Sequence, residues 1–123
     1  MAKILVVDDV PVVCEFISLA LTEAGHGVDM ASGGREAMEK IKSNHYDLLI
    51  TDLLMPDMDG FELVSAAKKQ LKQLKIIAIS AGGAISSDVY LDMADDRLQL
   101  DGRLPKPIEV DDLIELTERV LTK

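Results

Sequence analysis

Blocks of hydrophobic and polar positions alternate along this chain in a way that predicts strands and helices in turn. Short apolar runs such as residues 48–50 are typical of strands buried on both faces, whereas apolar residues at helical spacing fill the segments between them. The expected strands are residues 4–7, 27–31, 48–50, 75–80 and 102–104, and the expected helices are residues 11–24, 32–44, 59–71, 86–98 and 110–121. This alternation predicts an α/β fold of (βα)5 type, a doubly wound parallel five-stranded sheet with right-handed crossovers and helices on both faces.

Polar residues stand where four of the expected strands end. Asp8 and Asp9 follow the first strand, Asp52 the third and Lys106 the fifth, and Ser80 ends the fourth. Because ligands bind at the carboxyl ends of the strands in this architecture, we expect these side chains to share one crevice. Asp is also common in turns and at helix starts, so a purely structural interpretation exists for each carboxylate. One Asp would satisfy the start of the first helix, which leaves the second without a structural reason.

Composition narrows the choice of partners. The 123 residues, 48% of them hydrophobic, suffice for one core, and we expect one domain over residues 1–123. The net charge of −9 argues against direct binding to nucleic acid or to an anionic membrane. Cys14 cannot form an internal disulfide and no signal peptide or membrane span is evident, so we expect a cytoplasmic protein with a buried thiol. His26 and His45 lack partners at metal-ligand spacing and are expected to be solvated.

Three carboxylates in one crevice would repel one another, and a divalent cation would relieve that repulsion. Mg²⁺ suits such a site because it prefers hard oxygen ligands, keeps several waters and bridges carboxylates to phosphate. Lys106 and Ser80 on the remaining sides would then contact a phosphoryl group. One carboxylate is left to serve as a nucleophile that forms an aspartyl phosphate, and Asp52 is the central candidate.

These motifs together resemble one known family. The residues Asp8-Asp9, the run Asp52-Leu53-Leu54-Met55-Pro56-Asp57-Met58-Asp59-Gly60, the pair Ser80-Ala81 and the pair Lys106-Pro107 closely resemble the receiver domains of two-component response regulators, especially the single-domain chemotaxis type. The resemblance covers essentially the whole chain and implies the flavodoxin-like strand order 2-1-3-4-5. It implies that Asp52 is the phosphoacceptor. It also implies that Asp9, Asp52 and the backbone carbonyl of Leu54 bind Mg²⁺ directly, with Asp8 acting through water.

The same resemblance assigns the remaining site residues and the partners. Ser80 and Lys106 would contact the phosphoryl oxygens, and the Lys106–Pro107 bond would be cis. The donor would be a sensor histidine kinase or a histidine phosphotransfer protein, and a downstream protein would bind the surface of the fourth helix, fifth strand and last helix. The chain would be a signalling protein rather than a turnover enzyme, with self-catalysed phosphotransfer and slow self-dephosphorylation only.

The chain departs from the family pattern at a few positions. Receivers usually carry an aromatic residue three positions before the lysine, where this chain has Arg103. We expect Ser80 to move toward the phosphoryl group and any signal through Arg103 to run by charge and hydrogen bonding. The fourth helix is rich in acidic residues, which provide either a partner surface or simply a solvated face. These acidic residues are Asp92, Asp95 and Asp96.

Two positions bear on the lifetime of the phosphoryl group. The residues two past Asp52 and two past Ser80 flank the path of attacking water in receivers, and here they are Leu54 and Gly82. Neither side chain orients a water by hydrogen bonding, so we expect slow self-dephosphorylation.

The central carboxylate also allows other interpretations. A phosphatase of the haloacid-dehalogenase type would need an acid two residues after the nucleophile, where this chain has Leu54. A calcium loop aligned on Gly60 would place Met55 and Ala66 at its first and last ligand positions. Two alternatives stay open: a docking module that keeps the receiver fold without phosphorylation, and the regulatory half of a larger transcription factor or enzyme.

Overall fold

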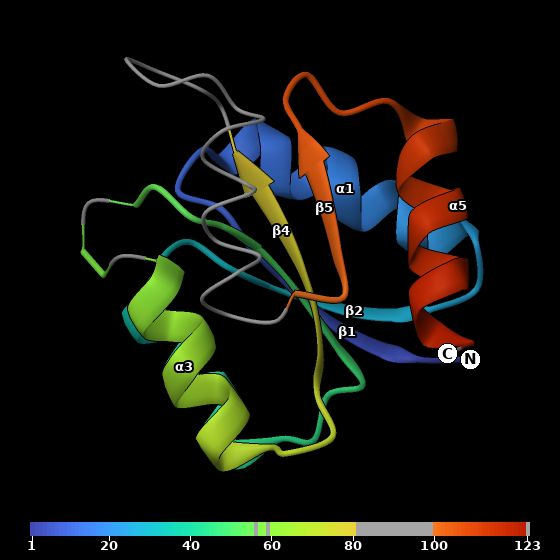
Figure 1. Ribbon diagram of the computed structural model, residues 1–123. Coiled ribbons are helices and arrows are strands. Elements are labelled where there is room, and N and C mark those ends of the chain that lie inside the picture. The colour runs from blue at the N-terminus through green and yellow to red at the C-terminus, as the bar shows by residue number, and fades with distance from the viewer. Residues whose placement is uncertain (56, 59, 81–99, 123) are drawn as a thin grey trace.

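Over residues 3–80 of the computed structural model, strands and helices alternate as the sequence predicts (Figure 1). The structure describes residues 1–55, 57–58, 60–80 and 100–122, with Ser80 by its backbone alone, and the helix expected over residues 86–98 lies outside this part. The strands are β1 (Lys3–Val7), β2 (Gly27–Ala31), β3 (Leu48–Asp52), β4 (Lys75–Ser80) and β5 (Gly102–Pro105). The helices are α1 (Pro11–Glu23), α2 (Gly34–Ser43), α3 (Gly60–Gln70) and α5 (Val110–Leu121).

All five strands are parallel and lie in the order β2-β1-β3-β4-β5, which confirms the expected α/β class and strand order. Every residue of β3 is buried, and in β1 only Lys3 is exposed. Strands covered on both faces need side chains that can be buried on both, and this explains the unbroken apolar runs in the sequence.

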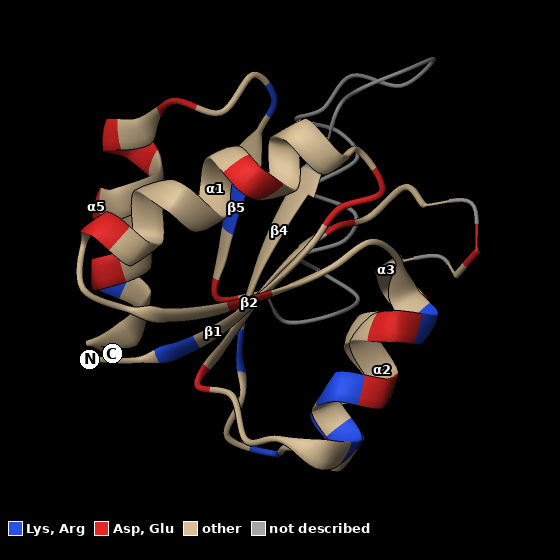
Figure 2. Ribbon diagram, turned by 180° about the vertical axis from the view of Figure 1, so that it is seen from behind, with Lys and Arg blue, Asp and Glu red and all other residues tan. Residues whose placement is uncertain are grey.

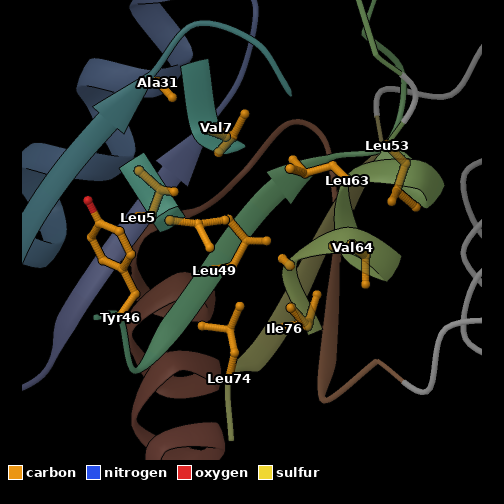
Figure 3. Packing of buried hydrophobic residues seen from close by; sticks show 14 of the residues in the cluster. Leu5, Val7, Ala31, Tyr46, Leu49, Leu53, Leu63, Val64, Leu74 and Ile76 are labelled. Carbon is orange, nitrogen blue, oxygen red and sulfur yellow. The ribbon is translucent and has the colours of Figure 1, made fainter. Parts of the chain in front are cut away.

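The sheet divides the hydrophobic core into two clusters. Successive side chains of a strand point to opposite faces, so Leu5 faces one cluster and Ile4 the other. Helices α2 and α3 cover the first face, where Figure 3 shows Leu5, Leu49 and Leu63 packed together. Helices α1 and α5 cover the second face and bury residues such as Leu113. The helices therefore pack on the two faces of the sheet, and the ends of its strands remain available for a functional site.

The register of the sheet brings its carboxyl ends to one level. Val7 at the end of β1 pairs with Thr51, so the next residue, Asp8, lies level with Asp52. Ser80 at the end of β4 pairs with Pro105, the residue before Lys106. Side chains that are distant in the sequence therefore meet at one edge of the sheet.

Charge is distributed unevenly over the helices (Figure 2). Helix α5 carries four acidic residues and one basic residue, whereas α2 carries three basic and two acidic residues. Helix α5 therefore has an acidic surface, whereas α2 does not. Among the residues that the structure describes, no helix combines the length and the apolar character needed to cross a membrane.

Candidate functional site

Three aspartates meet where β1 and β3 end. Asp8 follows β1 directly and Asp52 is the last residue of β3, and they are buried with 0% and 3% of their surface exposed. Asp9 is more open to solvent than either. One carboxylate oxygen from each residue lies within 4.8 Å of the other two. The structure therefore brings together the three acidic residues that the sequence pattern singled out.

Lys106 supplies positive charge to this pocket from the loop after β5. Its Nζ lies 2.9 Å from Oδ2 of Asp8 and 3.1 Å from Oδ2 of Asp52, and the side chain is largely buried. Oδ2 of Asp8 is also buried, and its contact with the ammonium is an ion pair rather than a well-aligned hydrogen bond. Because an unpaired buried carboxylate is costly, Lys106 offsets the burial of both aspartates. The Lys106–Pro107 peptide bond is cis, as expected.

The surroundings shift the protonation equilibria of the pocket. Burial raises the pKa of the Asp52 carboxyl above its ordinary value, against the opposing effects of the Leu54 N–H and the Lys106 ammonium, and the charge of Asp8 adds to the rise. Burial also acts to lower the pKa of Lys106, but its close contacts with the negatively charged Asp8 and Asp52 outweigh burial and raise that pKa. The ammonium therefore stays charged, while the crowded carboxylates would gain from a further cation.

The turn after β3 is fixed by bonds to the site. The N–H of Leu54 donates to Oδ1 of Asp52 over 2.9 Å, and the N–H of Leu53 donates to the carbonyl of Ile79 over 3.1 Å. The N–H of Gly60 returns to the carbonyl of Leu53 over 3.1 Å. A Cβ at Gly60 would lie 2.4 Å from Cα of Leu53, so this close approach requires glycine. The backbone of Leu54 is thus held beside the central carboxylate.

The donor set of the pocket fits a hard divalent cation. Three carboxylates face one ammonium, so the pocket has an excess of negative charge. Asp8 and Asp52 are buried, and water therefore screens their repulsion weakly. Carboxylate oxygens are hard ligands of the kind that Mg²⁺ takes in proteins, where it usually keeps several waters.

The family that shares this pocket is identified by the sequence as a whole. A family model described as the response regulator receiver domain matches residues 4–118. The chain belongs to this family. The resemblance read from the strand-end motifs is confirmed, and the chain is a receiver domain of the kind found in two-component response regulators.

Receivers of known structure match nearly the whole chain. The chemotaxis protein CheY4 of Vibrio cholerae is 33% identical with a TM-score of 0.85, and the match covers 98% of both chains. The response regulator TrrA of Thermotoga maritima, crystallised in complex with Mg²⁺ and BeF, is 34% identical with a TM-score of 0.83 over 98% of this chain and 99% of TrrA. The transcriptional regulatory protein TcrA of Mycobacterium tuberculosis is 33% identical over 112 residues, 90% of this chain. The chain spans only 42% of the length of TcrA.

Two further positions of the receiver lie at the same edge or next to it. The backbone of Ser80 ends β4 beside Pro105, and the role of its hydroxyl stays a prediction. Arg103 lies in β5 and is exposed beside a cavity of about 210 Å³ that Asp112 and Glu115 also line. Other residues named from the sequence lie outside the described part of the chain, namely Pro56, Asp59, Ala81, Gly82, Asp92, Asp95 and Asp96.

The histidines give one confirmation and one correction. His45 is 72% exposed, as expected. The expectation that His26 is solvated is wrong, because only 7% of its side chain is exposed. Its Nδ1 accepts the N–H of Ala2 over 3.2 Å, and its Nε2 lies 2.8 Å from Oε1 of Glu118. His26 thus ties the start of the chain to α5, at the end of the sheet opposite the pocket.

Proposed function

We propose that this receiver accepts a phosphoryl group on Asp52 from a phosphohistidine and passes the signal to a downstream protein. The donor is a sensor histidine kinase or a histidine phosphotransfer protein. The observation that carries the proposal is the buried carboxylate of Asp52, whose two oxygens are held by the N–H of Leu54 and by Nζ of Lys106. A carboxylate fixed in this way beside further acidic ligands suits phosphoryl transfer better than packing.

Four residues would hold Mg²⁺ in this proposal. Asp9, Asp52 and the backbone carbonyl of Leu54 would bind it directly, and Asp8 would bind through water. When bound, Mg²⁺ would neutralise the charge on the carboxylates and on the phosphoryl oxygens during transfer. Support comes from the clustered carboxylates and from TrrA, whose structure was solved with Mg²⁺ and BeF.

In the transfer step, a carboxylate oxygen of Asp52 forms a bond to phosphorus while the bond from phosphorus to the donor imidazole nitrogen breaks. The electron pair of the broken bond passes to that nitrogen, which takes up a proton from solvent. The ammonium of Lys106, 3.1 Å from Oδ2 of Asp52, stabilises the charge on the phosphoryl oxygens, and Ser80 donates its hydroxyl to them. The chain therefore contributes mainly positioning and electrostatic stabilisation.

The phosphoryl group would be read on the face expected from β5, α5 and the fourth helix, whose residues 86–98 lie outside the described part of the chain. Ser80, bound to the phosphoryl group, would shift the population of this face toward a state that binds the partner. Arg103 would contribute through charge, since the cavity beside it is also lined by Asp112 and Glu115. The acidic surface of α5 favours a partner with a basic docking surface.

The proposal also includes the extent of the domain and the compartment in which it acts. We place the receiver domain over residues 1–123 and the reaction in the cytoplasm, in keeping with a single buried thiol at Cys14. It acts as a signalling protein rather than as a turnover enzyme. A second candidate is the regulatory part of a larger transcription factor, which is favoured by the 42% of TcrA that the chain spans. Both candidates share phosphorylation at Asp52. They differ in whether the output is a separate downstream protein or a further part of the same protein.

The test is intact-mass analysis after incubation with acetyl phosphate, with and without Mg²⁺. Wild type is expected to gain a phosphoryl adduct that depends on Mg²⁺, and Asp52→Asn is expected to gain none. Asp47→Asn is a matched control, because Asp47 also binds a backbone N–H, that of Lys3 over 2.8 Å, at the opposite end of the sheet.

The outcomes separate the candidate functions. An adduct in wild type and in Asp47→Asn that disappears in Asp52→Asn supports the phosphoacceptor. An adduct that persists in Asp52→Asn moves the acceptor to another residue and overturns the assignment. No adduct in a wild type that does bind Mg²⁺ overturns the proposal in favour of a docking module that works without phosphorylation.

A further inference from the structure

The N-terminus of α2 is capped by a residue from a different part of the chain. The first N–H groups of a helix have no partners within it, and the N-cap residue here, Gly33, has no side chain to supply one. Asp57, from the loop between β3 and α3, fills this role. Its Oδ1 accepts the N–H of Gly34 and its Oδ2 accepts the N–H of Arg35, each over 3.2 Å.

The fit between this loop and α2 depends on two glycines. A Cβ added at Gly33 would lie 2.7 Å from Oδ2 of Asp57, and a Cβ added at Gly34 would lie 2.6 Å from Cβ of Met58. Such distances require the loop to move. Gly33 has an extended backbone with φ of −174°, which any residue adopts, so a side chain is excluded by the position of Asp57 and not by backbone conformation.

The same loop carries a proposed ligand of the metal. Leu54 is fixed at its N–H by Asp52, and Leu53 and Gly60 close the loop at its two ends. These contacts lie within the loop or between it and the strand it leaves, and the N–H of Leu53 also donates to Ile79 in β4. Asp57 adds a contact with a separate element, α2, whose residues Ala37 and Ile41 are anchored in the core.

Electrostatics favours an anion at this point. The N-terminus of a helix carries partial positive charge, and bonds from N–H groups to a carboxylate are stronger than neutral ones. The N–H of Arg35, followed by that of Gly34, lowers the pKa of Asp57 below its ordinary value. The carboxylate is therefore ionised and bound to α2 at neutral pH.

We propose that Asp57 is a positioning residue for the metal: by fixing the loop to α2, it holds the carbonyl of Leu54 ready to bind Mg²⁺. This inference rests on the proposed function, which places Mg²⁺ on that carbonyl. A loop that is already ordered loses less conformational entropy when it binds its ligand. Releasing the loop from α2 therefore weakens Mg²⁺ binding even though Asp57 is not itself a ligand.

The test is a calorimetric titration of Mg²⁺ into wild type and two variants that break the contact in different ways. Asp57→Ala removes the carboxylate, and Gly33→Ala displaces it while leaving its charge in place. Both are expected to raise the dissociation constant about tenfold, the lower end of what removal of an orienting partner costs a metal site. Asp57→Asn keeps one acceptor oxygen and is expected to fall between wild type and Asp57→Ala.

Matched controls separate this effect from loss of charge or of glycine. Asp47→Ala removes a carboxylate bound to a backbone N–H far from the pocket, and Gly27→Ala adds a Cβ whose nearest neighbour is 3.9 Å away. Both are expected to bind Mg²⁺ like wild type. The double variant Asp57→Ala with Gly33→Ala is expected to be no weaker than Asp57→Ala alone, because both changes break the same contact.

The free energy of unfolding in EDTA is measured for each variant, to separate positioning from capping alone. If Asp57→Ala unfolds more easily but binds Mg²⁺ as tightly as wild type, Asp57 only caps α2 and the inference is overturned. Equal weakening in Asp47→Ala would assign the effect to net charge and overturn it too. A wild type that binds no Mg²⁺ would overturn the proposed function and this inference with it.

Discussion

At Lys106 a single ammonium group balances two buried carboxylates. Its Nζ lies within 3.1 Å of both Asp8 and Asp52, and neither aspartate has more than 3% of its surface exposed. Removing one partner of a buried ion pair leaves an uncompensated charge, which costs far more than the net worth of the pair. The lysine therefore contributes to stability, in addition to its role in the proposed transfer of the phosphoryl group.

We expect Lys106→Met to lower the free energy of unfolding in EDTA by about 3 kcal/mol. Saturating Mg²⁺ should narrow the gap between variant and wild type, because the cation supplies the missing positive charge to the same carboxylates. Urea unfolding with and without Mg²⁺ measures both quantities. Lys42→Met, on the exposed side of α2, serves as the control and should change stability little. A gap that stays the same in Mg²⁺ would contradict this account of the pocket.

We expect Leu54 to influence the lifetime of the phosphoryl group if Asp52 is the acceptor. Its side chain is 46% exposed beside Asp52 and offers no hydrogen bond to an attacking water. We expect Leu54→Asn to lose the phosphoryl group roughly tenfold faster than wild type, below the hundredfold or more of full general-base catalysis. Phosphoprotein isolated from excess donor and followed by intact mass gives the rates. Leu54→Met keeps an apolar side chain and should behave as wild type does; equal rates in Leu54→Asn would refute the prediction.

Individual residues differed in how far the sequence could place them. Asp8, Asp9, Asp52 and Lys106 were predictable as neighbours because each lies at or just after the end of a strand and the register levels the strand ends. The burial of His26 was not predictable, since its partner Glu118 lies 92 positions away and only the packing of α5 brings it near. No local signal in the sequence marks such a pair.

At the scale of elements, α2 shows how a helix start can depend on a distant loop. The sequence predicted a helix opening near Gly33, which the structure confirms, but not the residue that caps it. Asp57 lies 23 positions from Gly34, and in the sequence it is typical of an ordinary turn residue. The periodic apolar face predicted the helix itself, because that signal is local, whereas the cap arises from tertiary contact.

The contribution of this cap should depend on pH. The pKa of Asp57 is lowered in the folded state, so its contribution to stability is present above the unfolded value of about 3.9 and is lost as pH falls through the folded value. In EDTA, we expect wild type to exceed Asp57→Ala in free energy of unfolding by about 1 kcal/mol at pH 7, and by less at pH 3. Urea titrations at the two pH values measure the difference.

Asp57→Asn provides the reference for that measurement. Its amide does not ionise in this range, so the difference between Asp57→Asn and Asp57→Ala should not change with pH. If wild type keeps its full advantage over Asp57→Ala at pH 3, ionisation of Asp57 does not contribute to the cap.

At the scale of the whole molecule, the parallel sheet both organises the pocket and separates the core. The alternation of strands and helices was sufficient to predict this architecture, because short connections between parallel strands allow few arrangements. The strand order came from the resemblance to receivers and is confirmed by the structure. The partner surface was less accessible to prediction, because it depends on how side chains from separate elements combine.

The two faces of the sheet should respond to mutation independently. Ile76 and Ile77 are adjacent in β4, yet Ile76 belongs to the cluster under α2 and α3 and Ile77 to the cluster under α1 and α5. Each change to Val should cost about 0.5 to 1.5 kcal/mol, and the double variant should equal the sum within about 0.5 kcal/mol. Ile77 and Ile79 share one cluster, and their double variant should deviate more from additivity. Urea unfolding of the single and double variants tests both statements.

This division of the core also bears on how the sequence can drift over evolutionary time. A side chain that shrinks on one face, such as Leu63, leaves space that only neighbours on that face can fill, because the backbone of the sheet stands between it and residues such as Leu113. Compensating substitutions should therefore arise in α2, α3 and their facing strand positions, or in α1, α5 and theirs, but seldom across the two sets. The two sides of the core would then accumulate compensating substitutions independently of each other. Both sides would continue to hold the strand ends of the sheet in place.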